Sequence, residues 1–234
     1  MKVIVATTAI PFVSGGADQF VEWLSLALKE AGHQVETLQF PFDPDSRRIP
    51  EQMLGLRLSD LSEHGDVLIT VRPPSYVLRH PRKVVWFIHH FRGLYDLWGT
   101  RYQDVPSSPE GIGIRNAVRS ADTNALSEAH AVFANSQAAA DRLARYNGIA
   151  AKVLYPPLWK PERFRSGEYG DSIVYINRMV HHKRQWLAVE AMRHTRTPVR
   201  LILAGAPDPD SALYVEELRE AIARYGLKDR VVLR

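Results

Sequence analysis

The chain has 234 residues, of which 45% are hydrophobic and 24% are charged, proportions that are typical of soluble globular proteins. Its formal net charge is only +4, which disfavours a nucleic-acid partner because dedicated nucleic-acid binders carry a larger basic excess. The absence of cysteine excludes disulfides and thiolate metal sites and favours a cytoplasmic location. No apolar run approaches the ~20 residues that cross a bilayer.

In the first two thirds of the chain, short apolar runs alternate with helical patterns, which is typical of a parallel sheet with crossover helices. The N-terminal stretch MKVIVATTAI has no cleavage-type region after it, so we interpret it as a buried strand and not as a signal peptide. A helix is expected over residues 17–32, where Gly32 supplies the stop. The expected strands are Val3–Thr7, Val35–Phe40, Val67–Val71, Val84–Ile88, Ala131–Ala134 and Lys152–Tyr155.

Prolines and glycines interrupt this pattern in YPPLWKPERFRSGEYGD, residues 155–171, which predicts a linker. A β-α-β-α-β series follows, formed by SIVYI, KRQWLAVEAMR, VRLILAG, SALYVEELREAIARYG and RVVLR. Such a series is half of a doubly wound sheet. We therefore expect an α/β protein with a Rossmann-like domain over residues 1–168, followed by a partial second Rossmann-like domain over residues 169–234.

Gly15 and Gly16 directly precede the first expected helix. The backbone N–H groups and the helix dipole at such a place can bind an anion, although two glycines can also form only a tight turn. The motifs G-x-G-x-x-G and G-x-x-x-x-G-K-[ST] are both absent, and no acidic residue that could hold a ribose ends the second strand. Nicotinamide-dependent dehydrogenases and P-loop kinases are therefore disfavoured.

The stretch YINRMVHHKRQ, residues 175–185, follows the linker and contains several cationic side chains. Its two adjacent histidines point in different directions on any regular element, and no carboxylate lies close by, so no metal site is expected. Arg178 and Lys183 lie at a strand end and a helix start, where open α/β sheets bind ligands. They could clamp a phosphate group, or they could be solvated charges at a helix entry.

Basic and aromatic residues are interleaved in RHPRKVVWFIHHFRGLYDLWGTR, residues 79–101. The part beyond Ile88 is expected in a loop at the carboxyl end of a strand, where His90, Arg92 and Tyr95 are candidate contacts for a sugar or anionic-lipid acceptor. His89 is the first residue after the strand. It could transfer a proton or hold a hydroxyl group, or it could be a histidine with a purely structural role in the loop.

Several stretches, in their order and spacing, resemble the GT-B glycosyltransferases of family 4, and the resemblance covers nearly the whole chain. They are SGGADQFVEWLSLALKEAGHQV, AHAVFANSQAAADRL, VLYPPL, YINRMVHHKRQWLAVEAM and VRLILAGA. This resemblance implies two Rossmann-like domains, of which the first mainly binds the acceptor and the second mainly binds the nucleotide-sugar donor.

The resemblance also implies roles for particular residues. Gly15 and Gly16 would approach the donor diphosphate through their backbone amides, and Arg178 and Lys183 would neutralise it. His89 would contact the transferred sugar. The implied reaction is transfer from a nucleotide-diphosphate sugar to a glycan or a lipid-linked acceptor, with retention of configuration, without a metal and without a cofactor.

The sequence departs from the family pattern at three places. Asn177 stands where the family usually has glycine, Asp18 stands where glutamate is common, and the pair of glutamates that holds the donor would lie beyond Arg234. We therefore expect a fragment that is inactive alone, that self-associates through its partial second domain, and that could contact the inner face of a membrane peripherally. Two alternatives stay open: a non-catalytic interaction module derived from a glycosyltransferase, and a sugar-phosphate-processing enzyme of similar architecture.

Overall fold

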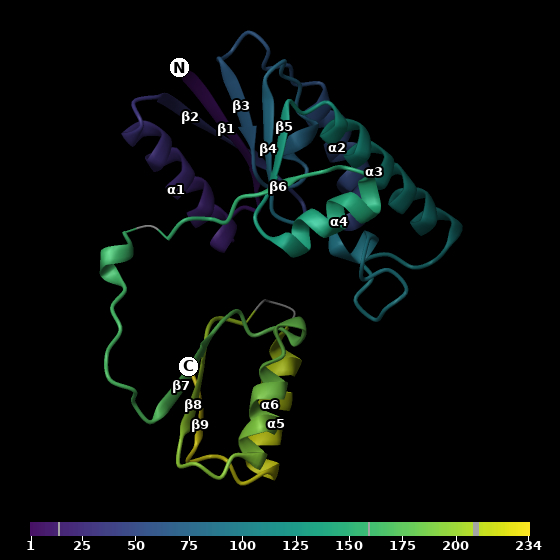
Figure 1. Ribbon diagram of the computed structural model, residues 1–234. Coiled ribbons are helices and arrows are strands. Elements are labelled where there is room, and N and C mark those ends of the chain that lie inside the picture. The colour runs from purple at the N-terminus through teal and green to yellow at the C-terminus, as the bar shows by residue number, and fades with distance from the viewer. Residues whose placement is uncertain (14, 159, 208–210) are drawn as a thin grey trace. The chain divides into compact units, whose positions relative to one another are not determined.

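Figure 1 shows the computed structural model of the protein, which describes residues 1–13, 15–158, 160–207 and 211–234. The chain divides into two compact units, residues 1–161 and 162–234. This division lies within the segment 155–171 that was expected to be a linker, and before the expected boundary at residue 168. Both units are built on parallel sheets with flanking helices, so the predicted α/β Rossmann-like fold class is confirmed.

The sheet of the first unit has six parallel strands in the order β2-β1-β3-β4-β5-β6. All six strands expected from the apolar runs are present, although β6 is shorter than expected. The strands are β1 (Lys2–Ala9), β2 (Gln34–Pro41), β3 (Val67–Thr70), β4 (Lys83–Phe87), β5 (Ala131–Ala134) and β6 (Lys152–Val153).

The helices of the first unit cover both faces of this sheet (Figure 1). They are α1 (Gly16–Glu30), α2 (Ile49–Arg57), α3 (Pro109–Ser127) and α4 (Gln137–Asn147). Neighbouring strand residues point to opposite faces, so Trp86 contacts Phe20 of α1, with ring centroids 4.5 Å apart, while Phe87 packs with Val118 of α3 and Leu143 of α4. The core of this unit is therefore two apolar layers separated by the sheet.

Local sequence signals explain where α3 and α4 begin and end. The hydroxyl oxygens of Ser108 and Ser136 accept hydrogen bonds from the backbone N–H groups of Gly111 and Ala139, at 3.2 and 3.3 Å. Such caps satisfy N–H groups that have no acceptor within the helix. Gly148 ends α4 with φ +67°, a conformation that glycine adopts without steric cost.

The second unit has a three-stranded parallel sheet in the order β7-β8-β9, with two helices packed on it. The strands are β7 (Ser172–Ile176), β8 (Arg200–Ala204) and β9 (Val231–Leu233), and the helices are α5 (Gln185–His194) and α6 (Ala212–Arg224). The expected β-α-β-α-β order is confirmed, with α5 starting at Gln185 instead of Lys183. In the described residues of both units, no helix is both long and apolar enough to cross a membrane.

Candidate functional site

The candidate site residues of the first unit follow the carboxyl ends of its strands. Gly15 and Gly16 follow β1, Arg72 follows β3, and His89 follows β4. Because these strands are parallel and adjacent, their carboxyl ends share one edge of the sheet. This is the edge at which open α/β sheets bind ligands.

The glycine loop is fixed by a contact that the sequence did not reveal. The N–H of Gly15 donates to Oδ2 of Asp18 at 2.7 Å, and Oδ1 of Asp18 accepts from Nη1 of Arg72 at 3.1 Å. Arg72 also donates to the carbonyl oxygen of Thr8 at 3.3 Å. A Cβ added at Gly15 or Gly16 would meet no atom within 4 Å, so the backbone of this loop is open to a ligand.

The glycine loop borders a cavity of about 710 Å³ between α1 and the edge strand β2. A hydrogen bond of 3.0 Å joins the hydroxyl groups of Ser25 and Thr37 in its lining. The lining combines apolar surface with amide, hydroxyl, carboxylate and ammonium groups. It consists of Gly15, Gly16, Asp18, Gln19, Val21, Glu22, Ser25, Leu26, Lys29, Thr37 and Gln39.

His89 is exposed beside this edge, and its protonation can be deduced from its hydrogen bond. Its Nδ1 lies 2.8 Å from the carbonyl oxygen of His90, which can only accept, so Nδ1 carries the proton and Nε2 of the neutral ring carries a lone pair. Loss of hydration by the surrounding protein, followed by the nearby charges of Arg72 and Arg92, lowers the pKa of His89. A neutral His89 can therefore accept a hydrogen bond from a hydroxyl group through Nε2.

His90 and Tyr95, which were expected to contact the acceptor, lie in the core. Their exposed fractions are 1% and 3%. Nε2 of His90 donates to Oδ1 of Asn147 at 2.8 Å, and the hydroxyl group of Tyr95 donates to Oδ2 of Asp122 at 2.6 Å. The expectation of direct acceptor contact by these two side chains disagrees with their burial, because the chain turns back over α3 and α4 directly after His89. Their observed role is to anchor this loop.

The same core cluster contains ionisable groups with shifted pKa values. Burial raises the pKa of Asp122 to about 6, although hydrogen bonds from Tyr95 and Tyr76 oppose the shift. The hydroxyl group of Tyr76 donates to Oδ1 of Asp122 at 2.7 Å. Burial also lowers the pKa of His90 to about 4, and its Nδ1 has no hydrogen-bond partner among the described residues. Burial thus shifts both pKa values toward the uncharged form, and at neutral pH His90 is uncharged while Asp122, which accepts two hydrogen bonds, is mostly ionised.

Arg92, the third expected acceptor contact, lies at the surface of the same loop. Its Nε and Nη2 donate to Oδ2 of Asp96 at 3.1 and 2.7 Å. Arg142 lies 3.3 Å from the same carboxylate. The guanidinium group of Arg92 is thus held by an ion pair, and its contact with an acceptor stays a prediction.

In the second unit, Arg178 and Lys183 lie in one loop after the carboxyl end of β7. The carbonyl oxygen of Arg178 accepts from Nε2 of Gln185 at 2.8 Å, and that of Lys183 accepts from the hydroxyl group of Tyr175. The hydroxyl group of Tyr214 donates to Oε1 of Gln185 at 3.2 Å. Hydrogen bonds to its backbone carbonyl groups therefore hold this loop against β7 and α5, and through Gln185 against α6. These bonds do not use the charged groups of Arg178 and Lys183.

Gly205→Ala is expected to destabilise the second unit by roughly 2 kcal/mol more than Gly226→Ala. Both glycines have positive φ, +145° and +66°, and alanine is strained in either conformation. An added Cβ at Gly205 would also collide with the carbonyl oxygen of Asn177, next to Arg178, whereas one at Gly226 meets no atom within 4 Å. The free energy of unfolding of each variant is measured by urea unfolding, followed by the amide NMR signals of residues 162–234. Equal destabilisation by the two substitutions would contradict the close approach of Gly205 to the carbonyl oxygen of Asn177.

The two groups of expected site residues belong to different units, so a clamp formed by Gly15 and Gly16 together with Arg178 and Lys183 stays a prediction. Within the part of the chain that the structure describes, no group of three or more histidine or acidic side chains could hold a metal ion.

The sequence matches no protein-family profile and no curated protein. Solved structures, however, share its fold. HepE of Anabaena in complex with UDP-glucose gives a TM-score of 0.57 at 17% identity, over 99% of this chain and 68% of that chain. A glycosyltransferase from Rickettsia africae gives 0.56 at 14% identity, over 100% and 68% of the two chains.

An alpha-glucosyltransferase in complex with UDP and DNA gives a TM-score of 0.51 at 12% identity, over 93% of this chain and 59% of that chain. At these identities the similarity shows the fold alone. It extends over both units of the chain, which confirms the α/β architecture expected from the sequence.

Proposed function

We propose that this chain belongs to a glycosyltransferase that transfers a sugar from a nucleotide-diphosphate sugar to a glycan or lipid-linked acceptor in the cytoplasm. The observation that carries the proposal is the match of its fold, over nearly its whole length, to solved structures that contain UDP or UDP-glucose. The same match supports a GT-B architecture, and we assign the chain to family 4 because its sequence motifs resemble that family.

On the donor side, Arg178 and Lys183 would stabilise the departing diphosphate. Arginine forms paired hydrogen bonds with phosphate oxygens, and lysine adds a compact positive charge. The N-terminus of α1, preceded by Gly15, would add backbone N–H groups and the positive end of a helix dipole. These groups stabilise the negative charge that develops on the leaving diphosphate, so the proposed mechanism needs no metal and no cofactor. We assign it retention of configuration, as the family resemblance implies.

On the acceptor side, the proposal uses His89 and the cavity beside α1. Nε2 of His89 could accept a hydrogen bond from a hydroxyl group of the sugar or acceptor. The cavity between α1 and β2 offers the uncharged amide and hydroxyl groups of Gln19, Thr37 and Gln39. Such groups suit a polyhydroxylated acceptor, so we place the acceptor there in preference to His90 and Tyr95.

Because the chain alone is expected to be inactive, the proposal is tested by calorimetric titration of a full-length protein that includes it with UDP-, GDP- and ADP-sugars, followed by turnover assays with any sugar that binds. We expect one nucleotide to bind through its diphosphate, turnover that continues with EDTA present, and a product with the donor's anomeric configuration by proton NMR. Failure of every nucleotide sugar to bind would contradict the proposal and favour the non-catalytic interaction module. Inhibition by EDTA would contradict only its metal-independent part.

We further propose that the chain self-associates through the edge strand β7. This strand exposes Ile173, Val174 and Ile176, at 50%, 56% and 73% of their surfaces. Exposed apolar edge strands pair with other chains, and a charge on the edge prevents this. We expect concentration-dependent dimers in analytical ultracentrifugation that Ile176→Lys abolishes and that Leu213→Lys, a change at an exposed helical leucine, leaves intact. A wild-type chain that stays monomeric at high concentration would contradict this.

A further inference from the structure

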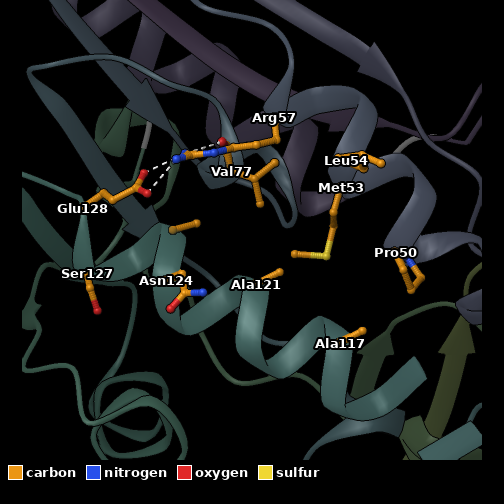
Figure 2. Close-up of a pocket in the computed structure, with 11 residues that line it drawn as sticks. Pro50, Met53, Leu54, Arg57, Val77, Ala117, Ala121, Asn124, Ser127 and Glu128 are labelled. Carbon is orange, nitrogen blue, oxygen red and sulfur yellow. Dashed lines mark hydrogen bonds and ion pairs between the residues drawn. The ribbon is translucent and has the colours of Figure 1, made fainter. Parts of the chain in front are cut away.

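A second cavity lies between α2 and α3 of the first unit (Figure 2). Its volume is about 640 Å³, within the range of sites that bind small molecules. The lining is apolar over most of its extent and charged at one end. It consists of Pro50, Met53, Leu54, Arg57, Val77, Ala117, Ala121, Asn124, Ala125, Ser127 and Glu128.

The apolar part of this cavity is wide because α3 presents small side chains to α2. Ala117, Ala121 and Ala125 are spaced four residues apart and so lie on one face of α3. Met53 of α2 extends into the space opposite Ala121 (Figure 2), and a methionine side chain adapts readily to a bound apolar group. The space opens to solvent, and a cleft of this size with an apolar wall is suited to a ligand.

The charged end of the cavity carries an excess of positive charge. Nη1 and Nη2 of Arg57 donate to the carboxylate of Glu128, each at 2.6 Å, and Nη1 also donates to the carbonyl oxygen of Val77 at 3.1 Å. Nζ of Lys83, a residue that is 1% exposed, lies 3.4 Å from Oε2 of Glu128. Two cations therefore share one carboxylate, and the group has a formal charge of +1.

Arg57 also keeps hydrogen-bonding capacity for a ligand. A guanidinium group has five N–H donors, and those of Arg57 that bond within the chain are on Nη1 and Nη2. In the described portion of the protein, the Nε–H group of Arg57 has no acceptor from the chain. A carboxylate that entered this end of the cavity would meet an unused donor and a positive charge.

We propose that this cavity binds an amphipathic anion, with a flat or unbranched apolar body between α2 and α3 and an anionic head beside Arg57. The site is separate from the candidate glycosyl-transfer site, so the proposal goes beyond that function and does not depend on it. Arg57 ends α2, Glu128 follows α3, and Lys83 begins β4. These positions place the charged end toward the amino-terminal edge of the sheet, whereas Gly15 and His89 lie at the carboxyl-terminal edge.

Methyl NMR of methionine tests the proposal, because the protein contains four methionines and one of them lines the cavity. Met53 reports binding, while Met1, Met179 and Met192 serve as internal controls. The probes are 2-naphthoate and 2-naphthylmethanol, which share an aromatic body and differ in the charge of the head. We expect both to shift the Met53 methyl signal through ring currents, with about tenfold tighter binding of the anion, the effect of one charge-assisted hydrogen bond.

Matched variants separate the apolar and charged contributions. Ala121→Leu fills the cavity and should abolish the Met53 shifts with both probes, whereas Ala138→Leu, at an exposed position of α4, should leave them unchanged. Arg57→Met should remove the preference for the anion while 2-naphthylmethanol still binds. Arg47→Met, at an exposed arginine outside the cavity, should keep the preference.

Three results would overturn the proposal: no shift of the Met53 signal, equal affinity for the two probes in the wild-type protein, or shifts that persist in Ala121→Leu. Amide spectra of each variant establish that it is folded. A folded Ala121→Leu protein that loses the shifts, together with an Arg57→Met protein that binds both probes equally, would support the proposal. None of these results depends on nucleotide-sugar binding, so failure here is distinguishable from failure of the proposed transferase function.

Discussion

In a full-length protein that includes this chain, Arg178→Ala and Lys183→Ala are each expected to slow glycosyl transfer by roughly 10²–10³-fold, the scale on which one charge-stabilising group acts in a transition state. The leaving diphosphate gains negative charge as the glycosidic bond breaks, so the loss of one cation should lower kcat more than it weakens donor binding. The measurement is single-turnover transfer with the nucleotide sugar that binds best. This prediction depends on the proposed glycosyltransferase function.

The matched control for these variants is Arg200→Ala. Arg200 is an exposed arginine of the same unit, but it begins β8, at the opposite end of the strand from the candidate loop. Its removal lowers the net charge equally and should leave the rate within twofold of wild type, as roughly expected for a distant surface charge. Near-normal turnover in both Arg178→Ala and Lys183→Ala would show that these charges do not stabilise the leaving group.

Asp122→Asn is expected to change how the stability of the first unit depends on pH. Burial raises the pKa of Asp122 from 3.8 to about 6, so the folded state binds this proton more tightly than the unfolded chain. Wild-type stability contributed by Asp122 is therefore complete below pH 3.8 and is lost as the pH rises to about 6. The free energy of unfolding of Asp122→Asn, relative to wild type, should increase by about 2 kcal/mol between pH 4 and pH 7.

His90 contributes in the opposite direction over a similar range. Its pKa is lowered from 6.5 to about 4, so its stabilising contribution is present above pH 6.5 and is lost as the pH falls to about 4. In wild type the pH dependences that arise from Asp122 and His90 partly cancel. Asp122→Asn keeps only the contribution of His90, so the free energy of unfolding of this variant should rise steeply from pH 4 to pH 6.5.

Urea unfolding at several pH values, followed by amide NMR signals of residues 1–161, measures the dependence of stability on pH. Asp141→Asn, at an exposed aspartate of α4, is the control and should keep the wild-type profile. Parallel profiles for wild type and Asp122→Asn would contradict the raised pKa of Asp122, whatever the absolute stability of the variant.

The positions of most strands along the chain could be predicted from the sequence. Runs such as Val3–Thr7 and Ala131–Ala134 are apolar, short and bounded by turn residues, and these are local properties that persist in the fold. The start of α5 was misplaced by two residues, because Lys183 lies in a short 3₁₀ turn and Arg184, with φ +61°, precedes the helix. Helix boundaries depend on such backbone details more than on periodicity.

The side chains that stabilise the candidate site could not be predicted in the same way. Asp18 and Arg72 are 54 residues apart in sequence, and Tyr76 and Asp122 are 46 residues apart. Their pairing depends on which strands and helices become neighbours. A single sequence contains no local signal of such contacts.

The sequence by itself determined the α/β class, the β-α-β-α-β series of the second unit, and the placement of Gly15 and Arg178 just after strand ends. These features depend on hydrophobic periodicity and on glycines that form turns, and both are local signals that extend over a few residues. Only the tertiary structure decided that His89 is exposed while its neighbour His90 is buried. It also decided that α2 and α3 line a cavity that has, at one end, an ion pair between residues 71 positions apart. Burial and long-range pairing are set by how whole elements pack, and residue type alone does not determine that packing.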